Sequence, residues 1–274
     1  MTHPVSRRTM LQTSGSLAAA AALGTASTGL LRAADADQPA PAHTIHETKV
    51  ISRQPDKYCG WPTLSRRKNG ELIVVWSGGR ESHVCPFGRV EMMRSHDDGQ
   101  SWTYPRVLLD GAIDDRDAGA LETAKGSLLV TTFTSLAYVP GLEKAIAAEG
   151  KAGTWDPARL DRWQAAHNRI SAEARQAELG TWMIRSTDGG ITWSARYDCL
   201  VNSPHGPVQL SDGRVLYPGK QLWEKNPRVG VAVSEDDGET WQWLAEIPAR
   251  EGDDPNNYHE LHGVEAADGR LVVH

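Results

Sequence analysis

The sequence is poor in cysteine, in positive charge and in long apolar runs. It has only three cysteines, and an odd number excludes a scaffold in which every thiol is paired. Its 29 lysines and arginines are outnumbered by 35 acidic residues, which argues against nucleic acid or an anionic membrane as a partner. No segment reaches the length of a membrane-spanning helix.

The first 33 residues differ from the rest of the chain. Arg7 and Arg8 precede the short, alanine-rich apolar run GSLAAAAALG, and LLRAADA follows it. This pattern predicts a twin-arginine signal peptide over residues 1–33, and hence a periplasmic or secreted protein with no membrane insertion after cleavage. Residues 34–55, which begin with ADADQPAPAHTIH, are expected to be a disordered lead-in.

One short pattern occurs three times, as SHDDGQSW at 95–102, STDGGITW at 186–193 and SEDDGETW at 234–241. The Asp-x-Gly centre is typical of turns, because Asp accepts hydrogen bonds from backbone N–H groups and Gly supplies a positive φ. Each box is therefore predicted to be a turn between two outer strands, with its tryptophan packed on the same unit. The role of the three aspartates is predicted to be structural: Asp97, Asp188 and Asp236.

A second repeated element, two apolar strands around a polar-glycine turn, precedes each box. Its turns are Asn69-Gly70, Lys125-Gly126, Asp212-Gly213 and Asp268-Gly269. A hairpin followed by a boxed hairpin makes a four-stranded unit, as in the blades of a propeller. The units are about 56–110, 114–200, 204–250 and 258–274. Because the last lacks its second hairpin, we expect the chain to be the first part of a longer protein.

The second unit is too long for one blade, and residues 139–179 hold the surplus. Asp156 suits a helix N-cap, Pro157 suits the first turn, and Gly180 suits the C-terminal cap. The sequence therefore predicts a helical insertion in the second blade. Two roles stay open for this insertion: a packing decoration on the rim, or a lid beside the binding face.

The three boxes resemble the Asp-boxes, or BNR repeats, of the sialidase superfamily, and the resemblance covers about residues 56–274. It implies an all-β, six-bladed, sialidase-like β-propeller, of which about three and a half blades are present. It also implies an exported exo-glycosidase that removes terminal, acidic sugars from a glycan or sialoside, with no cofactor. Because other propellers carry the box, two alternatives stay open: a hydrolase or lyase for another sugar, and a non-catalytic glycan-binding propeller.

The resemblance also assigns residues by position. CGWPTL matches the Arg-Ile-Pro segment of the family's first blade, with Gly60 in place of a carboxylate-binding arginine. The loop GGRESHVCPFG matches the one that carries the family's acid/base aspartate, but it contains Arg80, Glu81 and His83 and no Asp. Glu260 takes the position of the glutamate that polarises a tyrosine nucleophile, and that tyrosine is expected beyond residue 274.

Residues that lead into the innermost strands of a propeller line its central channel. Here those segments are CGWP, DDRDAG, SPHG and NYHELHG, and they predict one polar pocket. Glu260 is a candidate catalytic residue, and His83 or Asp117 is the candidate acid. The candidate substrate-binding residues are Arg80, Arg116, His205, His259 and His262. The last two face opposite sides of a strand, so no metal site is predicted.

The same topology bears on the cysteines. Cys59 leads into the first inner strand, and Cys85 follows the loop that leaves its hairpin partner. A disulfide between these two is therefore geometrically possible, and Cys199 is expected to be unpaired.

Overall fold

The computed structural model describes residues 44–149, 151 and 154–274. The predicted signal peptide at 1–33, and residues 34–43 of the predicted lead-in, lie outside the described residues. The chain divides into a short unit, residues 1–50, and a large unit, residues 51–274. In the large unit the lead-in residue Gln54 donates a hydrogen bond of 2.8 Å to the buried carboxylate of Glu91. Among the described residues no helix has the length and apolarity needed to cross a bilayer.

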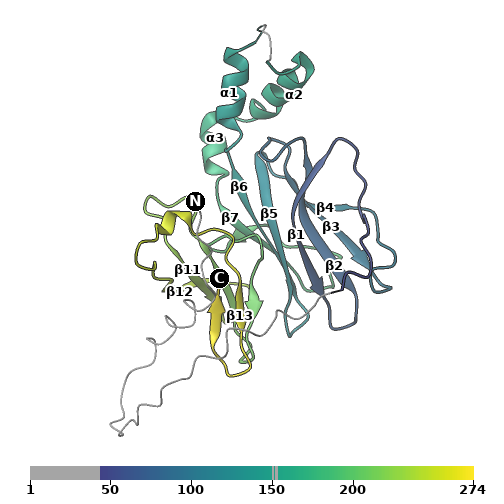
Figure 1. Ribbon diagram of the computed structural model, residues 1–274, viewed down its shortest axis with the longest axis vertical. Coiled ribbons are helices and arrows are strands. Elements are labelled where there is room, and N and C mark those ends of the chain that lie inside the picture. The colour runs from purple at the N-terminus through teal and green to yellow at the C-terminus, as the bar shows by residue number, and fades with distance from the viewer. Residues whose placement is uncertain (1–43, 150, 152–153) are drawn as a thin grey trace. The chain divides into compact units, whose positions relative to one another are not determined.

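The large unit is built from four antiparallel sheets whose strands follow chain order (Figure 1). The strands of the first sheet are β1 (Tyr58–Arg66), β2 (Leu72–Arg80), β3 (Arg89–Ser95) and β4 (Arg106–Leu109). Those of the second are β5 (Asp114–Glu122), β6 (Leu128–Ser135), β7 (Thr181–Ser186) and β8 (Tyr197–Asp198). Those of the third are β9 (Val208–Gln209), β10 (Val215–Lys220), β11 (Val229–Ser234) and β12 (Gln242–Glu246). A 3₁₀ turn (Pro255–Asn257) then leads to the fourth, β13 (Gly263–Glu265) with β14 (Leu271–Val273).

Each of the predicted polar-glycine turns joins the first two strands of a sheet, and its glycine has a positive φ: 89° at Gly70, 88° at Gly126, 94° at Gly213 and 81° at Gly269. This conformation is open to glycine at little cost, which explains why each hairpin forms at these dipeptides. The prediction of an all-β fold made of repeated hairpins is confirmed.

The three boxes are turns between the third and fourth strands of their sheets, as predicted. In the first box Ser95 Oγ donates to Asp97 Oδ1 at 2.8 Å, and the N–H of Ser101 donates to the same carboxylate at 2.9 Å. The hydroxyl of Ser101 also donates to Asp97, and these hydrogen bonds hold the pKa of that carboxyl at about 2. The other two boxes repeat the network with Thr192 and Thr240 in place of Ser101.

The tryptophans of the boxes pack on their own sheets, as predicted, and two of them also join clusters that include a neighbouring sheet. Trp102 lies on its own sheet, against Val74, Trp76 and Met93. Trp193 packs in a cluster that the second sheet shares with the first, and Trp241 belongs to a cluster that the third sheet shares with the second. The reason is that neighbouring sheets face one another: the first cluster combines β2 and β3 with β5, β6 and β7, and every residue of β2 is buried.

Three helices lie between β6 and β7, inside the range for which the sequence predicts helix: α1 (Val139–Ala147), α2 (Pro157–His167) and α3 (Ala172–Ala177). Asp156 caps α2 as predicted, because its carboxylate accepts the N–H groups of residues 158 and 159. The prediction for Gly180 is wrong, since α3 ends at Ala177 with Glu178 as its cap. A side chain at Gly180 would instead collide with the Trp182 indole, because an added Cβ lies 2.2 Å from it.

The helices are fixed to the loop after β2. Trp163 Nε1 donates a hydrogen bond of 2.9 Å to Glu81, and the indole packs in a buried cluster with Cys85 and Tyr138. This packing draws Cys85 into the helical cluster, while Cys59 is exposed on β1, and no disulfide joins them. The possible Cys59–Cys85 bridge is therefore not formed. Cys199 is free, as predicted.

Candidate functional site

The predicted site residues lie at the end of the sheets opposite the boxes. In the first sheet Leu72 pairs with Ser95 at the box end, whereas Arg80 pairs with Tyr58 at the other end. In the second sheet Asp114 pairs with Ser135 at that same far end, where the helices begin (Figure 1). The boxes and the candidate site are thus on opposite ends of the same strands.

The segments that lead into the inner strands converge in space. Thr63 Oγ1 on β1 donates to the carbonyl of Pro204 at 2.9 Å. Gly119 on β5 touches the backbone of Gly206 so closely that an added Cβ would lie 2.3 Å from the Gly206 Cα. The hydroxyl of Ser203 donates to the carbonyl oxygen of Leu261. Segments that are far apart in sequence therefore meet, and three of them, β5 and the segments around Gly206 and Leu261, carry predicted site residues.

Three residues of the candidate site share a left-handed backbone conformation. Trp61 and Asp117 each have a φ of 50°, and Glu260 has a φ of 55°, which is unusual for residues other than glycine. Trp61 and Asp117 lie in equivalent irregularities, where the register shifts between Gly60 and Thr63 and between Arg116 and Gly119. All three stand nine positions before the turn glycine of their hairpin. Left-handed backbone of this kind costs about 1–3 kcal/mol and is concentrated at functional sites.

Arg116 is a buried cation with no acceptor. Its side chain is 9% exposed, and its guanidinium donates no hydrogen bond within the described part of the chain. The guanidinium carbon lies 4.8 Å from the ring centre of Trp61 and 5.6 Å from that of Phe133. Burial lowers the pKa of Arg116, against the opposing charge of Asp117. Aromatic faces compensate the charge only in part, so the site favours an anionic ligand.

The neighbouring Asp117 is a carboxyl group that can hold a proton near neutral pH. Burial raises its pKa from 3.8 to about 7, against the positive charges of Arg116 and Arg80 and with a further contribution from the Glu260 carboxylate. Its Oδ1 is buried without a hydrogen-bond partner. Asp117 is thus coupled electrostatically to Glu260, which is exposed in the loop between the 3₁₀ turn and β13.

Arg80 is fully buried, and its terminal donors are used within the fold. It makes a bidentate pair with Asp114, at 2.7 and 2.9 Å, and it also donates to Ser77 Oγ at 2.9 Å and to the carbonyl of His83 at 2.7 Å. These bonds hold the end of β2 against the start of β5. Arg80 therefore shapes the site and gives it positive charge; its two terminal nitrogens already have partners, and its buried Nε has none among the described residues.

His83 belongs to a group of rings that the sequence reasoning missed in part. The ring centre of Trp61 lies 5.0 Å from that of His83 and 6.1 Å from that of Tyr58, and all three side chains are at least partly exposed. Partial burial, followed by the charges of Arg116 and Arg80, lowers the pKa of His83. The position of Trp61, nine residues before a turn glycine like Asp117 and Glu260, is the signal that could have found it.

The predicted histidines are only partly brought together. The ring centres of His205 and His262 are 5.5 Å apart, and His274 lies 6.1 Å from His262. Nδ1 of His262 is buried without a partner, and burial and the adjacent histidines lower its pKa. His259 is exposed. Over the described ranges, no set of three or more His, Cys, Asp or Glu side chains is arranged to hold a metal ion.

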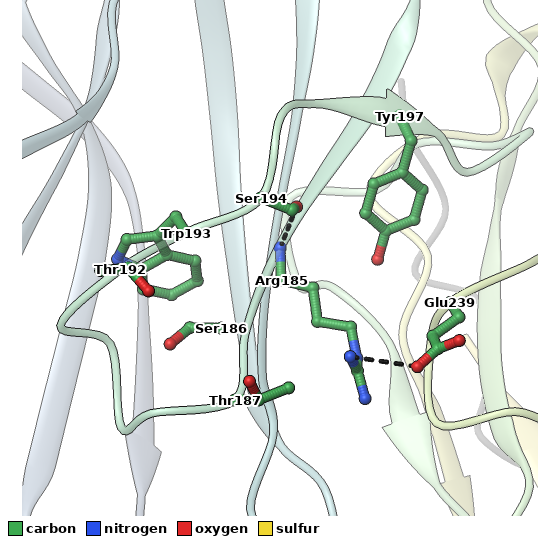
Figure 2. Close-up of a pocket in the computed structure, with 8 residues that line it drawn as sticks. All are labelled: Arg185, Ser186, Thr187, Thr192, Trp193, Ser194, Tyr197 and Glu239. Carbon is green, nitrogen blue, oxygen red and sulfur yellow. Dashed lines mark hydrogen bonds and ion pairs between the residues drawn. The ribbon is translucent and has the colours of Figure 1, made fainter.

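A cavity of about 420 Å³ lies elsewhere, at the second box (Figure 2). Arg185 and Glu239, which line it, form an ion pair of 3.3 Å, and Arg185 also pairs with Asp237 at 2.7 Å. The charged groups of this cavity thus neutralise one another across the second and third sheets. None of the predicted site residues lines it, and its ion pairs serve to join sheets.

Comparison with known proteins agrees with this architecture. The family model for the BNR/Asp-box repeat matches residues 184–195, which contain the second box. These residues, which join the outer strands of the second sheet, are thus similar to a BNR/Asp-box repeat. A solved structure of a protein of unknown function from Dyadobacter fermentans has a similar fold, with a TM-score of 0.58 and 18% identity over 82% of this chain and 63% of its own.

The relatives point to one superfamily. A sialidase from Paraclostridium sordellii is 22% identical over 240 residues, which are 79% of this chain and 52% of that sialidase. The intramolecular trans-sialidase from Ruminococcus gnavus shares the fold with a TM-score of 0.51 and 14% identity, over 78% of this chain and 65% of its own. The chain spans only 34–55% of the length of the curated sialidases that it matches. These findings confirm the predicted resemblance to the sialidase superfamily.

Proposed function

We propose that the protein is an exported glycoside hydrolase of the sialidase type, which releases a terminal acidic sugar from glycans. The carrying observation is the pair formed by Arg116 and Asp117: a buried guanidinium without an acceptor beside a carboxyl group whose pKa is about 7. In this proposal the whole protein is a six-bladed propeller, the four sheets belong to its first blades, and the helices are an insertion in the second.

Arg116 is the proposed anion-binding group. A buried cation needs a compensating charge or hydrogen bonds, and within the described residues this one has neither a paired carboxylate nor any other acceptor at hydrogen-bond distance. The carboxylate of an acidic sugar would supply both through charge-assisted hydrogen bonds to the planar guanidinium. Trp61, whose ring lies against Arg116, would hold the guanidinium in place while the ligand binds.

Asp117 is the proposed proton donor. A glycosidase needs an acid that is protonated at the working pH, and efficient acids have a pKa close to that pH. Asp117 meets this condition, whereas the lowered pKa of His83 leaves that ring neutral at pH 7. Of the two acids that the sequence leaves open, we therefore choose Asp117.

Glu260 is the proposed partner of a tyrosine nucleophile, as the resemblance to sialidases implies. Glu260 has a left-handed backbone and an exposed side chain, and its carboxylate interacts electrostatically with Asp117. In this proposal Asp117 supplies the proton to the leaving group, and Glu260 accepts a hydrogen bond from the tyrosine that attacks the sugar. The remaining predicted groups, His205, His259 and His262, are proposed substrate contacts.

The test is hydrolysis of a fluorogenic aryl sialoside by the full-length protein. Asp117→Asn is expected to lower kcat about 10²-fold or more, as the loss of a positioned acid does. Wild-type activity should fall as pH rises above about 7, because Asp117 then loses its proton. Asp212→Asn, in an exposed turn, is the control and should be as active as the wild type. A fully active Asp117→Asn enzyme would exclude Asp117 as the acid.

One observation favours a second candidate, a hydrolase or lyase for a different sugar. The family's first-blade arginine is replaced by Gly60, and a Cβ at this position would lie 2.9 Å from the Tyr58 ring. The ring thus fills the space that a longer side chain would need. If the full-length protein cleaves uronic or neutral glycosides but not sialosides, this second function replaces the first.

The proposal also includes export of the protein from the cytoplasm. The twin arginines Arg7 and Arg8 and the small-residue run behind them are the basis for proposing a signal peptide over residues 1–33 and a periplasmic or secreted protein. Replacing both arginines with lysine should retain the protein in the cytoplasm of a bacterium with twin-arginine export. Normal export of this double variant, measured by fractionation, would exclude the twin-arginine route.

A further inference from the structure

A second hollow lies at the same end of the sheets as Arg116. It is a cavity of about 210 Å³ between the segment that follows α3, residues 179–182, and the loop that follows β10, residues 221–224. Ligand pockets that enclose a whole drug-sized molecule measure about 300–1,000 Å³, so this cavity has room for one part of a ligand.

The cavity is connected to the proposed site through aromatic side chains. Thr181, which lines the cavity, lies opposite Phe133 of β6 in the sheet, and Phe133 in turn lies opposite Arg116 of β5. The ring of Phe133 lies 5.6 Å from the Arg116 guanidinium carbon on one side and 6.4 Å from the ring of Trp223 on the other. A ligand held at Arg116 can therefore extend over Phe133 toward Trp223.

Two tryptophans line the cavity, and they differ: Trp182 is held in place by neighbouring side chains, whereas Trp223 is exposed. Trp182 is held in place, because its Nε1 donates to Thr134 Oγ1 at 3.0 Å and Arg196 covers its ring at 4.4 Å. Trp223 on the opposite loop is 44% exposed, and no side chain of the described residues covers it as Arg196 covers Trp182. Beside it stand the polar side chains of Gln221 and Glu224.

This combination matches the chemistry of a sugar ring. A pyranose has an apolar C–H face, which an exposed indole can contact, and a rim of hydroxyl groups, which amide and carboxylate groups can bind. We propose that the cavity is a second subsite that holds the sugar next to the terminal residue of the glycan. The inference rests on the proposed function, since Arg116 must hold the terminal sugar.

Trp223→Ala tests the subsite with two substrates. The expected result is a rise of about fivefold in KM for a sialyl-lactose trisaccharide, from the loss of one aromatic contact, and no change in KM for a methyl sialoside, whose one-carbon aglycone cannot reach the indole. Tyr104→Ala removes an aromatic side chain that is 94% exposed and does not line the cavity, and it should change neither value. Equal changes for both substrates, or no change for either, overturn the subsite.

Binding separates this inference from the proposed function. In an Asp117→Asn background, calorimetry should show tighter binding of the trisaccharide than of free sialic acid, and Trp223→Ala should abolish the difference. If this preference is found and the wild type hydrolyses neither substrate, the proposed hydrolase is wrong and the subsite stands. If the trisaccharide has no advantage over sialic acid, the subsite is wrong whether or not the protein is a hydrolase.

Discussion

Replacing Asp117 with Asn should make the protein more stable at neutral pH and should change how its stability depends on pH. Burial raises the pKa of this carboxyl from 3.8 to about 7. Between these values the folded state keeps a proton that the unfolded chain has lost. The free energy of unfolding of the wild type therefore falls as pH rises from about 4 to about 7, and this contribution stays constant above that.

The size of the effect follows from the two pKa values. At about 1.4 kcal/mol per pH unit, the difference between 3.8 and about 7 corresponds to roughly 4 kcal/mol. Asparagine resembles the protonated carboxyl group and never ionises. The variant should thus equal the wild type in stability near pH 4 and exceed it by an amount that grows to roughly 4 kcal/mol above pH 7.

Urea denaturation at intervals between pH 4 and pH 8.5 measures this difference. Asp97→Asn is the matched control, because hydrogen bonds lower the pKa of Asp97 to about 2 and the group is ionised across the whole range. Its stability relative to the wild type should not vary with pH. If Asp117→Asn and the wild type differ in free energy of unfolding by the same amount at pH 5 and at pH 8.5, Asp117 does not have a raised pKa in the folded state. Comparison with the variant also removes the contribution of Asp115, whose pKa burial likewise raises to about 7.

Two further predictions concern the joints between sheets. Arg185→Met should lower the free energy of unfolding by about 3 kcal/mol in urea denaturation, because the Asp237 side chain, 4% exposed, loses its ion-pair partner. Arg214→Met, which removes an exposed ion pair, should cost about 0.5 kcal/mol or less. Equal losses in the two variants would contradict the importance of the buried pair. Gly119→Ala should lower stability by about 1–3 kcal/mol, since its Cβ would lie 2.3 Å from neighbouring backbone, whereas Gly141→Ala, in open space on α1, should raise it slightly. A neutral Gly119→Ala would mean that the strands do not approach so closely.

The parts of the fold that the sequence predicted depend on local contacts. In each box the aspartate bonds to residues within four positions of itself, so the eight-residue pattern contains the whole turn. The hairpin glycines and the cap at Asp156 are equally local. Their residue types are sufficient to specify the conformation, and the spacing of these turns then gives the sheets.

The errors arise where distant segments meet. Cys85 is close to Cys59 in topology, but its direction is set by helices more than fifty residues further along the chain, so no bridge forms. Arg80 reads from the sequence as a free arginine in a loop, and only the fold supplies Asp114 as its bidentate partner. Gly180 resembles a helix cap, yet it makes room for an indole.

The contrast between the boxes and the site bears on function. The boxes repeat the same residues because they perform the same structural task in each sheet. At the position nine residues before the turn glycine, the left-handed backbone is repeated but the side chain changes, from Trp61 to Asp117 to Glu260. In the third hairpin this position is Pro204, whose ring excludes a positive φ, and its carbonyl accepts a hydrogen bond from Thr63 instead.

A repeated backbone with differing side chains is expected where several sheets face one asymmetric ligand. Each side chain then contacts a different part of that ligand: an aromatic surface, a proton donor and a carboxylate. Packing alone would favour similar residues at equivalent positions, as it does in the boxes. The differences between the repeats, rather than their similarity, thus support the proposed binding site.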